Sequence, residues 1–172
     1  YDNISLFNKK SRCIFSMNMF KEKREIYHED ISIVPEFSTI KKMNLSTNCT
    51  EYSGTDFIAL PKEFFALSKR RSMRVLVTMG AADPENFTNK VIKSIEYIQR
   101  KDLNFDIILP NKNVNVCQIK NKYITLHKFG SIDFAAALKE AQFAIINGGM
   151  TRYECIASRT YFIALSLHKR QY

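Results

Sequence analysis

The apolar positions divide the chain into a weakly patterned first part and a strongly patterned second part. Up to about residue 50 no period is sustained, and the sequence indicates only a helix within residues 15–26 and a short strand at residues 31–34. From residue 74 onward, short apolar runs alternate with segments whose apolar residues recur at helical spacing. This change of pattern predicts that the second part carries the regular fold.

Five apolar runs have the length and composition of buried strands. They cover residues 75–79, 105–109, 123–126, 143–146 and 161–167. Helices are predicted at 61–67, 132–141, 151–157 and in the segment from Pro84 to Ile98, with Asp83 as its N-cap. Strands that alternate with helices predict an α/β fold with a doubly wound parallel sheet, a Rossmann-like arrangement.

Two glycine-containing turns follow strands of this sheet, at Gly80 and at Gly148-Gly149. Ligands of doubly wound sheets bind at the carboxyl ends of strands. A strand that breaks at two glycines and restarts as a helix leaves backbone N–H groups at a positive helix end, which suits a phosphate. A structural role remains the alternative for each glycine, because βα turns often need positive φ.

Two polar side chains follow the second turn. Thr151 lies in the first turn of the predicted helix, and Glu154, three residues on, shares its face. A carboxylate at that place is suited to accept hydrogen bonds from sugar hydroxyls. Neither turn has the G-x-G-x-x-G or P-loop pattern, so a dinucleotide fold and a phosphate-loop ATPase are disfavoured.

Composition narrows the classes of partner. The formal charge of +9 favours anionic partners, but the basic residues are dispersed and no nucleic-acid-binding motif occurs, so we expect no nucleic acid as a partner. No apolar run approaches the roughly 20 residues of a membrane helix, and we expect no membrane span. The four cysteines lack metal-ligand spacing, which predicts no metal, no cofactor and a cytoplasmic location. The start at Tyr1 and the stop soon after a strand predict a fragment of a longer protein.

Three segments together carry a resemblance to a known family. Residues 74–88 resemble a strand followed by a "GGxDP.N.T" turn, residues 144–154 with Gln171 resemble an "A..GG.T..E" helix and a following Gln, and residues 54–64 are similar to a "GP.Y..LR.EF" junction. These motifs, in their order along the chain, resemble those of the bacterial nucleotide-sugar hydrolases of pseudaminic and legionaminic acid synthesis and of the related spore coat polysaccharide biosynthesis protein G. The resemblance covers about residues 50–172.

The resemblance implies a GT-B architecture, in which two Rossmann-like domains face a cleft. Residues 1–60 would then be the tail of the first domain with a linker, and residues 61–172 the nucleotide-binding C-terminal domain, truncated at its end. It implies a UDP-sugar as substrate, with phosphate, ribose or sugar contacts from Gly80, Gly148, Gly149, Thr151, Glu154 and Gln171.

The implied reaction is hydrolysis that releases UDP from a diacetamido-trideoxyhexose, without a required metal. The family's proposed base is a histidine of the first domain that lies outside this chain, so no catalytic residue is assigned. Two alternatives stay open: a GT-B glycosyltransferase and a non-catalytic nucleotide-sugar-binding module. The chain departs from the family at Pro61, Ala81, Arg159 and Tyr161, and these departures bear on activity more than on fold.

Four further side chains are candidates for chemistry. His127 and His168 follow predicted strands on the ligand side, where each has either a ligand-contacting or a structural role. Cys155 adjoins Glu154, but we expect it to point toward the sheet and not to act as a nucleophile. Arg159 is either a phosphate partner or a solvated surface residue.

Overall fold

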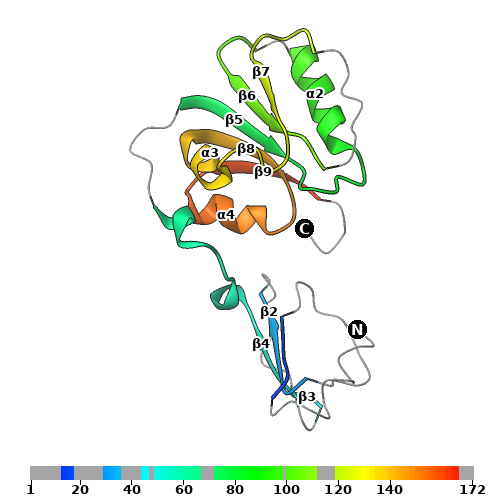
Figure 1. Cartoon of the computed structure of the whole chain (residues 1–172), viewed down its shortest axis with the longest axis vertical. Coiled ribbons are helices and arrows are strands. Elements are labelled where there is room, and N and C mark those ends of the chain that lie inside the picture. Colours follow the sequence, from blue (N-terminus) through cyan, green and yellow to red (C-terminus); the bar gives the residue numbers. More distant parts are fainter. Residues whose placement is uncertain are drawn as a thin grey trace. The chain divides into compact units, whose positions relative to one another are not determined.

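The computed structural model describes residues 13–17, 29–35, 44–46, 49–66, 72–98, 100–111 and 119–166. The chain divides into two compact units, Tyr1–Ala59 and Leu60–Tyr172. Each unit has its own sheet (Figure 1). The assignment of the first unit to the tail of a Rossmann-like domain stays a prediction.

Within the described part of the first unit, four short strands form one sheet in the order β1-β2-β4-β3. The strands are β1 (Phe15–Met17), β2 (Ile31–Val34), β3 (Asn44–Ser46) and β4 (Cys49–Ser53), and only the β3–β4 pair is antiparallel. The predicted strand at residues 31–34 is confirmed. The predicted helix is wrong at its start, because Phe15 to Met17 pair with β2 and backbone pairing outweighs local propensity.

The second unit confirms the predicted fold class. Its described strands form a parallel five-stranded sheet in the order β7-β6-β5-β8-β9. They are β5 (Ser72–Thr78), β6 (Asn104–Ile108), β7 (Ile124–His127), β8 (Ala141–Asn147) and β9 (Tyr161–Leu165). All five predicted strands are present, with ends that differ by a few residues at most.

Helices cover both faces of this sheet (Figure 1). On one face α2 (Phe87–Ile98) packs through Val91, Ile92 and Ile95 against alternate residues of β5 and β6. On the other face α3 (Phe134–Glu140), α4 (Thr151–Ala157) and the 3-10 helix η2 (Lys62–Phe65) share a core with β5 and β8. The first unit ends near a second 3-10 helix, η1 (Thr55–Phe57).

Three predicted helices differ from the structure in extent, and the one expected over residues 132–141 forms only over Phe134–Glu140. The segment at residues 61–67 forms only η2, a single 3-10 turn whose Phe64 is buried against Phe134 at a ring-centroid distance of 6.2 Å. The helix expected to begin at Pro84 begins at Phe87, because residues 83–86 form a separate turn with positive φ at Asp83 and Asn86. A turn of this kind places a capping side chain before the helix without extending it.

The strand order fixes where a ligand is expected. From β5 the chain first builds outward through β6 to β7, then returns to the other side of β5 to add β8 and β9. The direction of winding therefore reverses between β5 and β8. In open α/β sheets this switch point, outside the carboxyl ends of the strands, is the usual ligand site.

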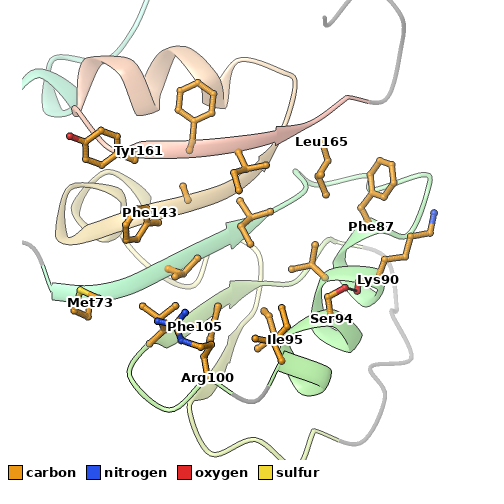
Figure 2. Close-up of a pocket in the computed structure, with 18 residues that line it drawn as sticks. Met73, Phe87, Lys90, Ser94, Ile95, Arg100, Phe105, Phe143, Tyr161 and Leu165 are labelled. Atoms are coloured by element: carbon orange, nitrogen blue, oxygen red, sulfur yellow. Dashed lines mark hydrogen bonds between the residues drawn. The ribbon is translucent and has the colours of Figure 1, made fainter.

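An apolar groove of about 1010 Å³ lies beside α2 and extends along the sheet to Tyr161 and Ile163 of β9. Figure 2 shows its lining side chains, which come from α2, from the segment between α2 and β6, and from β5, β6, β8 and β9. Tyr161 and Ile163 remain 72% and 65% exposed there, because α2 covers β5 and β6 rather than β9. Most of the groove is apolar, and Lys90, Ser94 and Arg100 are the polar residues in its lining.

Candidate functional site at the sheet switch point

Both predicted glycine turns lie at the switch point. Gly80 directly follows Met79 at the end of β5, and Gly148 directly follows β8. Because β5 and β8 are hydrogen-bonded neighbours, with Thr78 opposite Ile146, the two turns lie side by side. The structure thus brings together Gly80, Gly148 and Gly149, which the sequence places far apart.

Asn147 connects the two turns, a role that the sequence analysis did not assign. Its Nδ2 donates to the carbonyl oxygen of Met79 at 2.9 Å, and its Oδ1 accepts from the Gly149 N–H at 3.3 Å. A primary amide supplies a donor and an acceptor in one plane, which is what these two partners require. The signal in the sequence was a polar residue that ends an apolar strand directly before two glycines.

The two glycines adjoining Asn147 are constrained for different reasons. Gly80 has φ +76°, a conformation that residues with a Cβ rarely adopt, and a Cβ there would lie 3.0 Å from Asn147 Nδ2. Gly149 has no such φ, but a Cβ would lie 3.2 Å from Asn147 Oδ1. Both glycines therefore make room for the asparagine side chain, whether or not they also approach a ligand.

Thr151 and Glu154 lie together in the first turn of α4, as the spacing predicted. Both are half-buried. Burial raises the pKa of Glu154 above its ordinary value of 4.5, and the hydrogen bond from Thr151 opposes this rise. The pair offers a ligand an adaptable hydroxyl and a partly desolvated carboxylate acceptor.

The helix that follows the glycines is shorter than a strong dipole requires. α4 has seven residues, and its first turn carries the acidic Glu154. Arg152 also lies in the first turn of the helix, and its side chain contacts Tyr153. Its Nη2 donates to the Tyr153 hydroxyl at 2.8 Å, and its guanidinium lies 4.7 Å from the Tyr153 ring centroid. The anion-binding potential of this end therefore rests on local N–H groups rather than on a long helix dipole.

Asp83 lies in the first turn and caps the helix that follows it. Its carboxylate accepts from the N–H groups of Phe87 at 2.8 Å and Thr88 at 2.9 Å, and the residue is only 7% exposed. This confirms its predicted role as a cap of α2, although the helix begins later than expected. With both oxygens engaged in capping, Asp83 is a structural residue of the turn.

The remaining candidates lie elsewhere or outside the described residues. His127 ends β7, and its Nε2 lies 2.8 Å from Asp106 Oδ1, while Arg74 binds the other oxygen of Asp106 at 3.0 Å. Of the two roles left open for His127, these contacts therefore support the structural one.

Gln171 and His168 lie outside the described residues. Cys155 is fully buried, and burial together with the Glu154 charge raises its pKa to about 12, so it does not act as a nucleophile.

Two of the departures from the family motif, Arg159 and Ala81, have local explanations. Arg159 is exposed and has φ 56°, directly after the C-cap Ser158, so it occupies the left-handed position where a helix commonly ends in glycine. It lies at the far end of α4 from Gly149, which supports the surface role over a phosphate contact. Ala81 is exposed and has no positive φ, so its turn does not require glycine there. Tyr161 begins β9 on the apolar groove.

Two features are absent from the described residues, a metal-binding cluster and a membrane-spanning helix. No three side chains among their His, Cys, Asp and Glu residues come close enough to hold a metal ion. In the same part of the chain, none of the helices has the length and apolar character needed to cross a membrane.

Comparison with known proteins gives one related sequence and distant structural similarity. No protein-family model matches the chain. The chain is 24% identical over 166 residues to spore coat polysaccharide biosynthesis protein SpsG of Bacillus subtilis (strain 168), which covers 89% of this chain and 49% of that protein. The chain therefore spans about half the length of this relative.

Two solved structures have similar chains. One is the glycosyltransferase SnogD from Streptomyces nogalater, with a TM-score of 0.46 and 17% identity over 66% of this chain and 30% of that one. The other is the spinosyn forosaminyltransferase SpnP, with a TM-score of 0.47 and 13% identity over 82% of this chain and 36% of that one.

Proposed function

We propose that the second unit binds the UDP portion of a nucleotide-sugar at the switch point between β5 and β8, and that the protein acts in polysaccharide biosynthesis. The observation that carries this proposal is the meeting of two glycine turns beside a half-buried Thr151–Glu154 pair. Turn N–H groups suit phosphate oxygens, and a carboxylate suits ribose hydroxyls. The similarity to SpsG, named for spore coat polysaccharide biosynthesis, supports the biological process.

For the reaction, glycosyl transfer is the better supported candidate. The synthesis of a polysaccharide joins sugars, so a relative named for that process favours transfer of the sugar to an acceptor. Both transfer and hydrolysis attack the anomeric carbon and release UDP, and they differ in the nucleophile. Hydrolysis is the second candidate, because the motifs around Gly80 and Glu154 resemble those of nucleotide-sugar hydrolases.

Calorimetric titration with UDP tests the binding half of this proposal. The wild-type chain should bind UDP, and Glu154→Ala should bind about 10- to 100-fold more weakly, since hydrogen bonds to a charged group contribute about 1.5–3 kcal/mol. Glu140→Ala, which removes an exposed carboxylate at the end of α3, is the matched control and should bind as the wild type does. Absence of wild-type binding at millimolar UDP would refute the proposal, and equal affinities of wild type and Glu154→Ala would refute the assignment of Glu154.

A further inference from the structure

We infer that Asn147 is the positioning residue of this site: its amide holds the β5 turn and the β8 turn in the single arrangement that a diphosphate requires. The inference rests on the proposed function and extends it to a residue that does not itself need to touch the ligand. One amide bonds Met79 on the first turn, at 2.9 Å, and Gly149 on the second, at 3.3 Å.

The orientation of this amide is determined by its two partners. A carbonyl oxygen only accepts and a backbone N–H only donates, so Nδ2 must face Met79 and Oδ1 must face Gly149. Aspartate in the same place would keep the acceptor for Gly149 but set a carboxylate oxygen against the Met79 carbonyl. It would also add negative charge between the turns that receive the diphosphate.

The bond to Met79 has two consequences for an anionic ligand. It fixes the β5 turn to the β8 turn before binding, so the ligand does not bear the entropic cost of ordering them. It also engages the Met79 carbonyl oxygen, whose partial negative charge disfavours a nearby phosphate. Removal of the amide should therefore weaken UDP binding, although no ligand contact is deleted.

The inference makes Gly149 dependent on Asn147. A Cβ at Gly149 would lie 3.2 Å from Asn147 Oδ1, and the other two neighbours within 4 Å, at 3.8 and 4.0 Å, are atoms of the same side chain. A methyl group at Gly149 therefore meets Asn147 alone. If the amide is absent, the same methyl group meets open space.

A double-mutant cycle on the whole chain tests this dependence, with UDP affinity measured by calorimetry. Asn147→Ala should weaken UDP binding about tenfold, and Asn147→Asp should weaken it further. Gly149→Ala should weaken binding several-fold in the wild type but less than twofold in the Asn147→Ala background. Asn104→Ala, which removes an exposed asparagine at the amino end of β6, should leave affinity unchanged.

The outcomes separate this inference from the proposed function. If the wild type binds UDP and Asn147→Ala binds within twofold of it, the positioning role is refuted while the UDP site stands. Equal losses from Gly149→Ala in both backgrounds would likewise refute the link between the two residues. If the wild type does not bind UDP, both the proposed function and the positioning role fall. Unfolding midpoints measured in parallel identify a variant whose loss comes from misfolding, and Asn147→Gly then replaces Asn147→Ala in the cycle.

Discussion

Asn147 Nδ2 lies 2.9 Å from the carbonyl oxygen of Met79, a residue 68 positions earlier in the chain. Because Met79 follows β5 and Asn147 ends β8, this hydrogen bond spans the point where the winding of the sheet reverses. The same amide explains why glycine stands in both turns, since a Cβ at Gly80 or Gly149 would crowd the Asn147 side chain. The site is therefore organised around a polar connection between two turns.

The raised pKa of Glu154 predicts a pH dependence of UDP binding. Ribose hydroxyls donate to the ionised carboxylate, so affinity should fall as the pH drops through a pKa that burial has raised above 4.5, and level off at higher pH. Calorimetry over a pH series measures this. UDP has its own titrating phosphate, so Glu154→Gln is the reference, and identical pH profiles of the two proteins would contradict the role of Glu154.

Arg159→Gly should stabilise the fold. The residue has φ 56° and is exposed, so glycine removes the steric strain of the left-handed conformation without deleting a buried contact. We expect a gain of about 0.5–1 kcal/mol in the free energy of unfolding, measured by urea denaturation. Arg159→Ala removes the same charge but keeps a Cβ, and should show no such gain. Equal effects of the two substitutions would assign the change to the charge.

Cys155 should resist alkylation in the folded protein. The thiol is fully buried and its pKa is raised to about 12, so the reactive thiolate is scarce at pH 8. Cys13 is exposed and should react readily under the same conditions. Peptide mass spectrometry after brief treatment with iodoacetamide compares the two sites, and treatment in urea should make them equal. Rapid native labelling of Cys155 would contradict the packing of α4 against the sheet.

The two aspartate caps should differ in their effect on stability. Asp83 is buried and accepts from two N–H groups at the start of α2, whereas Asp133 accepts from Ala136 alone at 3.0 Å and is exposed. We expect Asp83→Ala to lower the free energy of unfolding by about 2 kcal/mol and Asp133→Ala by about 1 kcal/mol. Urea denaturation measures both. A smaller loss for Asp83→Ala than for Asp133→Ala would show that the turn before α2 does not depend on its carboxylate.

The periodic part of the sequence was sufficient to predict the second sheet. Continuous apolar runs such as residues 75–79 and 143–146 predicted strands buried on both faces, because core packing leaves little choice at those positions. The helix beginning at Thr151 was also predicted at its first residue. Local signals were less reliable where tertiary contacts decide: Phe15 pairs in a sheet, and the segment after Pro61 makes only one turn around the buried Phe64.

The sequence predicted where the two glycine turns lie but not how they are connected. Sequence spacing placed Gly80 and Gly149 after strand ends and Glu154 in the helix that follows, yet it carried no information on the 68-residue separation that the Asn147 amide closes. A hydrogen bond of this kind depends on which strands become neighbours, and that follows from the strand order rather than from any local pattern. The roles in ligand binding stay predictions for all six residues: Gly80, Gly148, Gly149, Thr151, Glu154 and Gln171.

The position of bound UDP is tested most directly by amide chemical shifts of the ¹⁵N-labelled chain during a UDP titration. UDP at the switch point should shift the amide signals of Gly80, Gly149 and Thr151 together, with one dissociation constant, and leave Tyr161 and Ile163 of the apolar groove unchanged. Shifts confined to the groove, or no shifts at millimolar UDP, would contradict binding at the turns joined by Asn147.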